Sequence, residues 1–158
     1  MLRTLRGAVA LLALVGAAGT AHAELVSPSD PQVIADIVKS QGRPAELVLS
    51  DDSNPIIRSE HRGIKFVVLF MNCKDDHTGC RTLQYYMGFT DAKDTTLERL
   101  NEWNSSKRFA RAYRDDEGDP VLEMDVDVDF AGLPRENVGE TFNTWTSLMD
   151  AYREFLFD

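Results

Sequence analysis

The chain has 158 residues, 43% of them hydrophobic, with 26 acidic residues against 17 basic ones and a net charge of −9. Such an acidic chain lacks the basic surface that the phosphates of a nucleic acid require, so we expect no nucleic acid among its partners. The length suits one domain with a single hydrophobic core.

The first residues have the three parts of a secretory signal peptide. Arg3 and Arg6 supply a basic start, a short apolar run follows, and an A-x-A cleavage site ends at Ala23. The apolar run is too short to span a bilayer core of about 30 Å, although a retained anchor is the alternative. We predict a signal peptide over 1–23, a single mature domain over 24–158, a periplasmic or secreted protein, and no membrane insertion after cleavage.

The first half of the mature chain reads as one helix followed by four strands. Asp30 as N-cap and Pro31 at the first helical position begin the helix, and Gly42 ends it. Alternating or continuous apolar residues, separated by turn residues, then predict strands over 45–50, 56–61, 64–72 and 81–89. The stretch over 64–72 is apolar on both faces, which is typical of a central strand.

Cys73 and Cys80 flank the turn between the last two of these strands. In an exported protein an even pair of cysteines predicts a disulfide, because the compartment is oxidising. The alternative is a metal held by the two cysteines and His77, with Asp75 or Asp76 as a fourth ligand. We favour the disulfide and expect no metal or other cofactor.

Ser59, Glu60 and His61 include the residue types of a hydrolase triad. They are adjacent on one strand, so Glu60 faces away from the other two, and the chain holds no G-x-S-x-G motif. We therefore expect no catalytic residues and no enzyme.

A second helix is predicted before the chain turns into another strand. Thr95 and Glu98 fit a capping box, and three apolar residues follow at helical spacing: Leu97, Leu100 and Trp103. Asn101 and Asn104 flank the tryptophan. They could form a polar recognition pair, but we favour a buried Trp103 with both asparagines bracing the loop, because large aromatic residues are mostly buried.

Two more strands and a long helix complete the chain. The strands are expected over 108–114 and 120–130, with the acidic turn 115–118 between them. In the second strand alternate residues face inward (Met124, Val126, Val128 and Phe130) and the others outward (Asp125, Asp127 and Asp129). Arg108 or Arg111 is expected to lie opposite these carboxylates and relieve their repulsion.

The three aspartates and Glu136 imitate an EF-hand loop, but Phe130 stands where that loop needs glycine, so we expect no calcium site there. The helix that begins at Pro134 carries the strongest periodic pattern in the chain. Its apolar residues recur at steps of three and four: Val138, Phe142, Trp145, Met149, Tyr152 and Phe155. We expect this stripe to face the core.

Two sequence patterns resemble the YbjN family, described as bacterial sensory transduction regulators. They are Leu100-Asn101-x-Trp103-Asn104 and Arg108-Phe109-x-Arg111-Ala112-Tyr113, followed by a short acidic hairpin; the two upstream cysteines fit as well. The resemblance covers about residues 45–155. It implies a fold similar to type III secretion chaperones, but no agreed activity and no catalytic residues.

The combined prediction is an α+β domain with an antiparallel sheet of about six strands and three helices, in the order α-β-β-β-β-α-β-β-α. The signal peptide, the resemblance and the absence of catalytic motifs together predict an exported, non-enzymatic binding or regulatory module that holds a protein or peptide partner, with a homodimer as a possible assembly. A periplasmic ligand-binding or metal-binding protein is the alternative. The candidate motif residues are Asn101, Trp103, Asn104, Arg108, Phe109, Arg111 and Tyr113.

Overall fold

The computed structural model describes residues 23–157, so the predicted signal peptide lies almost entirely outside the described residues. No helix in the described part is both long enough and apolar enough to cross a bilayer. The main sheet and the helices follow the predicted order, and the fold is the predicted α+β fold.

The helices are α1 (Pro31–Ser40), α2 (Leu97–Ser106) and α3 (Arg135–Phe157). The main sheet contains β2 (Glu46–Ser50), β3 (Ser53–His61), β4 (Ile64–Met71), β5 (Thr82–Gly88), β6 (Arg111–Arg114) and β7 (Pro120–Asp127). A small sheet that the sequence did not predict joins β1 (Leu25–Val26) to β8 (Leu133–Pro134).

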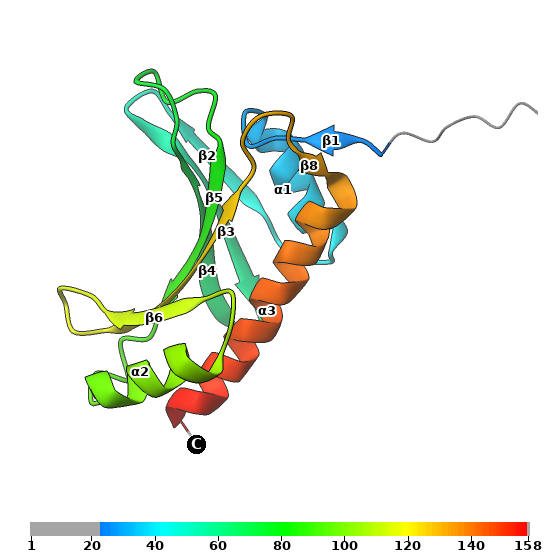
Figure 1. Ribbon diagram of the computed structural model, residues 1–158. Helices are drawn as coiled ribbons and strands as arrows, with labels where there is room; N and C mark the ends of the chain where they lie inside the picture. Colours follow the sequence, from blue (N-terminus) through cyan, green and yellow to red (C-terminus); the bar gives the residue numbers. More distant parts are fainter. Residues whose placement is uncertain (1–22, 158) are drawn as a thin grey trace, which may run out of the picture.

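All neighbouring strands of the main sheet are antiparallel, in the order β2-β3-β4-β5-β7-β6. After β5 the chain forms α2 and β6, and then returns as β7 between β5 and β6. β6 is therefore a short edge strand, and α2 lies beside it (Figure 1).

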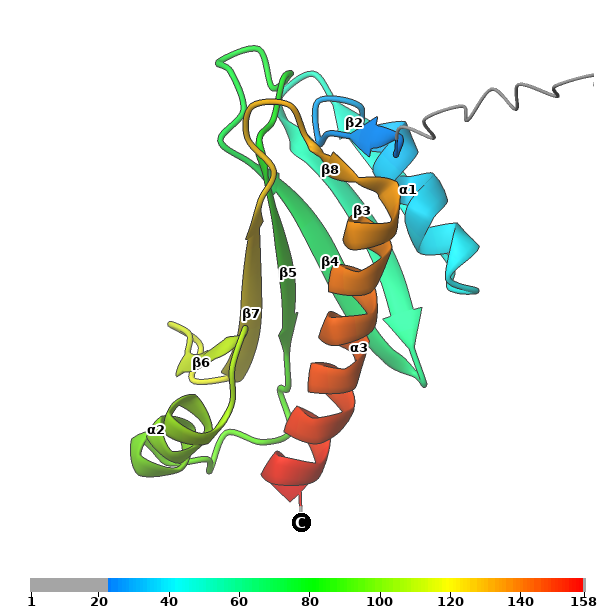
Figure 2. The same ribbon diagram turned by 45° about the vertical axis from the view of Figure 1, so that its right-hand side comes forward.

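One face of the sheet is covered by α3, with α1 alongside its N-terminal half (Figures 1 and 2). The predicted stripe of α3 is buried from Val138 to Tyr152, and Phe155 is half-buried. Trp145 is fully buried between Phe66 of β4 and Tyr85 of β5, with ring centroids 6.2 and 5.7 Å away. Burying these large side chains is the main term that stabilises the fold.

The predicted start of the second helix was wrong by one residue. Thr96, not Thr95, is the N-cap, and its hydroxyl accepts a hydrogen bond from the Arg99 amide. Leu97 is 64% exposed and does not belong to the buried stripe. α2 reaches the core through Leu100 and Trp103, further along the helix, so its first turn stays in solvent.

Three strand boundaries were also predicted wrongly. β3 begins at Ser53 rather than at residue 56, and the other two errors lie beside phenylalanines. β6 begins at Arg111 rather than at residue 108, and β7 ends at Asp127 rather than at residue 130. In both places a phenylalanine has a positive φ, 75° at Phe109 and 62° at Phe130. This left-handed conformation interrupts the extended backbone, and Phe130 is fully exposed instead of facing inward.

Candidate functional site

The candidate motif residues lie on α2, on β6 and on the link between them, and they have different roles. Trp103 is fully buried, and its ring lies 4.9 Å from that of Tyr152 and 5.4 Å from that of Phe155, both on α3. Trp103 therefore anchors α2 to the core, as predicted.

Asn104 closes the outer edge of β6. Its amide nitrogen donates to the Ala112 carbonyl at 2.9 Å, and its carbonyl oxygen accepts from the Ala112 amide at 2.8 Å. The side chain thereby replaces the neighbouring strand that an edge residue lacks. Asn101, in contrast, is exposed and makes no side-chain hydrogen bond within the described residues, so the predicted bracing role holds for Asn104 alone.

Arg111 and Tyr113 converge on Glu123, which is only 6% exposed. The Arg111 guanidinium donates to Oε2 of Glu123 from Nε at 2.9 Å and from Nη2 at 2.5 Å, and the Tyr113 hydroxyl donates to Oε1 at 2.6 Å. Burial and the hydrogen bond to Glu123 raise the pKa of Tyr113, and the hydrogen bond to Glu123 also raises the pKa of Arg111. This network fixes β6 to β7.

The sequence did not indicate the role of Glu123. The one feature of the sequence that could have indicated it is the position of an acidic residue between the apolar residues Leu122 and Met124. Of the two arginines expected near the acidic strand face, Arg111 does reach Asp125, with Nη1 3.8 Å from Oδ2. Arg108 does not; its guanidinium lies 4.9 Å from the centre of the Phe109 ring.

Phe109 is 66% exposed and stands at the edge of a groove between β7 and α3. The groove has a volume of about 350 Å³, near the lower end of the range for ligand sites. It is lined by Phe109, Met124, Asp125, Val126, Leu133, Asn137, Glu140, Thr141 and Thr144. The lining combines apolar side chains with the carboxylate of Glu140 and has no basic residue, so it suits an apolar group with positive charge beside it. The Asp125 carboxylate points to the outer face of the sheet, where it contacts Gln84 and Arg111.

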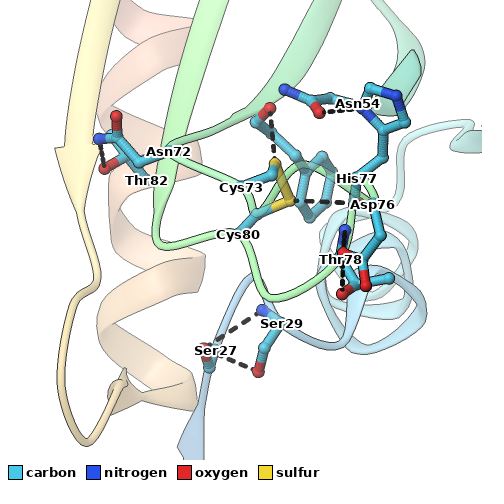
Figure 3. Close-up of a disulfide and its surroundings, with 11 residues drawn as sticks. Ser27, Ser29, Asn54, Asn72, Cys73, Asp76, His77, Thr78, Cys80 and Thr82 are labelled. Carbon is cyan, nitrogen blue, oxygen red and sulfur yellow. Dashed lines mark hydrogen bonds between the residues drawn. A yellow bond between two sulfur atoms is a disulfide. The ribbon is translucent and has the colours of Figure 1, made fainter. Parts of the chain in front are cut away.

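Cys73 and Cys80 form a disulfide across the β4–β5 turn, as predicted (Figure 3). Because both sulfurs are bonded to each other, neither is a free thiolate that could bind a metal at the alternative site. His77 Nδ1 lies 2.8 Å from Oδ1 of Asn54, and Asp76 accepts hydrogen bonds from the hydroxyl and the amide of Thr78. The bonds from Thr78 lower the pKa of Asp76. These polar groups order the loop.

An acidic cluster that the sequence did not predict lies in the β6–β7 turn. Carboxylate oxygens of Asp115, Glu117 and Asp119 lie within 4.8 Å of one another. The Lys93 ammonium is 3.1 Å from Oδ1 of Asp119 and donates to the Glu117 carbonyl at 3.0 Å. A cation of the chain itself thus neutralises part of this cluster.

Ser59 and His61 face the interior while Glu60 is exposed, as the alternation predicts. Nε2 of His61 lies 3.0 Å from Oδ1 of Asp150 on α3. The Ser59 hydroxyl donates to the Pro44 carbonyl at 2.7 Å. The serine proton therefore points to a backbone acceptor and not to the imidazole, unlike the nucleophile–base pair of a hydrolase.

Comparison with known proteins identifies the family. A search of curated proteins gave no match. The model of the YbjN family, described as "Putative bacterial sensory transduction regulator", matches residues 30–158, which is most of the chain. The residues around β6 that suggested the resemblance fall within this match, and the chain belongs to the YbjN family.

Proposed function

We propose that the mature chain is an exported, non-enzymatic regulatory module that holds a protein or peptide partner in the groove beside Phe109. The groove is the observation that carries this proposal, because it places a large exposed aromatic ring next to an apolar floor. The regulator description of the family is consistent with a role in binding.

Export is supported by the signal-peptide pattern of the first 23 residues and by the disulfide, a bond typical of oxidising compartments. A non-enzymatic role is supported by the hydrogen bonds of Ser59 and His61. Ser59 donates to the Pro44 carbonyl and His61 pairs with Asp150, so the two side chains are not bonded to each other.

A peptide-display selection tests the proposed function. Random peptides are selected against the oxidised mature protein, and each enriched peptide is then measured against two variants of α3. Thr144→Arg places a long charged side chain in the groove, and Ser147→Arg places the same side chain on the exposed surface one turn later.

We expect the enriched peptides to bind wild type and Ser147→Arg equally and to lose at least tenfold in affinity for Thr144→Arg. Circular dichroism establishes that both variants are folded. A selection that enriches no sequence, or enriched peptides that bind Thr144→Arg as tightly as wild type, would contradict the proposed function.

A further inference from the structure

β7 is paired with β6 along only half of its length. The register runs from Arg114 opposite Pro120 to Arg111 opposite Glu123, where β6 ends. Residues 124–127 continue β7 and pair with β5 on the other side. On the β6 side these four residues have no neighbouring strand within the described part of the chain, and Figure 2 shows this upper half of β7 at the margin of the sheet.

The backbone hydrogen bonds at the two ends of β7 show which backbone groups face this open side. The Phe89 amide donates to the Pro120 carbonyl, and the Val128 amide donates to the Arg81 carbonyl, so even-numbered residues of this strand point toward β5. Hydrogen-bonding groups alternate along a strand. The N–H and C=O groups of Asp125 and Asp127 therefore point to the open side.

Phe109 explains why β6 does not continue along this edge. In the register of β6 it would stand opposite Asp125, but its φ of 75° turns the chain away toward Lys107, the C-cap of α2. A bulky residue seldom adopts this conformation, because the left-handed region is sterically strained for residues with a side chain. The turn leaves the edge open and places the Phe109 ring beside the groove.

The open edge and the groove are two sides of the same segment. The side chains of Met124 and Val126 line the groove, while the backbone groups of Asp125 and Asp127 form the edge. A strand added here would point alternate side chains into the groove and to the outer face of the sheet.

We propose that the open edge of β7 binds an extended segment of the partner, antiparallel to β7 and in line with β6, in which aliphatic and basic residues alternate. This inference rests on the proposed function, since it names the class of segment that the groove holds. The aliphatic side chains enter the groove, and the residues opposite Asp125 and Asp127 are lysine or arginine.

The charges of the edge select this class of segment. Residues directly opposite one another in an antiparallel pair share a face, so a basic residue opposite Asp125 or Asp127 lies next to a carboxylate. Arg111 already places a guanidinium 3.8 Å from Asp125 on this face. The same two aspartates disfavour pairing between two copies of this edge, because like charges would meet.

The test uses the peptide acetyl-KVKLKVK-amide and amide hydrogen exchange of the oxidised mature protein measured by NMR. Bound peptide should slow exchange of the Asp125 and Asp127 amides at least tenfold. The amides of Met124 and Val126, which face β5, should change little. Asp127→Lys should weaken binding at least tenfold, whereas the matched change Asp116→Lys in the exposed turn should not.

Backbone methylation separates strand addition from simple contact. N-methylation of the lysine amides, which face β7, should abolish protection, and N-methylation of the valine and leucine amides, which face away, should not. Binding that shifts the Thr144 resonance but leaves Asp125 and Asp127 unprotected would overturn strand addition while the proposed function stands. No protection at millimolar peptide would also overturn it. Failure of the proposed function appears separately, when the selection enriches no peptide or when the enriched peptides bind Thr144→Arg as tightly as wild type.

Discussion

Replacing Asn104 by alanine should destabilise the protein by roughly 1.5–5.5 kcal/mol. The amide side chain satisfies both backbone groups of Ala112, a residue that is only 4% exposed. An unpaired buried N–H or C=O costs about 1–3 kcal/mol. Two such groups cost about 2–6 kcal/mol, and the better helix propensity of alanine offsets about 0.5 kcal/mol of this, which leaves roughly 1.5–5.5 kcal/mol.

Asn101→Ala is a matched control for this prediction. It makes the same chemical change in the same helix at an exposed position, so it should alter stability by no more than about 0.5 kcal/mol. Urea unfolding of the oxidised proteins, followed by circular dichroism, gives both values. Equal unfolding midpoints for the two variants would refute the role of Asn104 in closing the edge of β6.

Three further predictions concern the disulfide, alkaline pH and metal ions. Replacing Cys73 and Cys80 by serine should lower stability by about 2–3 kcal/mol in urea while the circular dichroism spectrum keeps its shape; an unchanged midpoint would contradict this. Burial raises the pKa of Tyr85 from 10.0 to about 12. The stability contributed by the neutral, buried Tyr85 phenol is therefore complete below about pH 10 and is lost as the pH rises to about 12. Tyr85→Phe should flatten this decline of stability with pH. An equal slope in the variant would show that other groups cause the decline. Because Lys93 neutralises part of the acidic turn, calorimetry should find zinc and calcium binding weaker than micromolar, and tighter binding would disprove this reading.

The central strands and the long helix could be predicted because their apolar pattern is the direct signature of burial. Ile64–Met71 is apolar on both faces and lies in the middle of the sheet, and the α3 stripe from Val138 to Tyr152 is buried. Trp103 could be predicted for the same reason. In these segments the local pattern and the tertiary environment agree.

The site was harder to predict because it depends on register and on backbone dihedrals. The residues over 108–114 alternate as a strand does, but the φ of Phe109 ends the strand there, and no spacing pattern reports that angle. Glu123 meets Arg111 because the two stand opposite each other in the ladder. Pairing of this kind is a property of the folded sheet, so neither residue alone indicates it.

The central claim is that a partner occupies the groove, and site-specific photo-crosslinking in native cells tests it most directly. A photoreactive phenylalanine analogue is placed at Thr144 in the groove or, as a control, at the exposed Ser147. We predict one discrete adduct from position 144 and none from position 147, with the crosslinked peptide carrying alternating aliphatic and basic residues. Equal crosslinking from both positions, or none from position 144, would contradict the account.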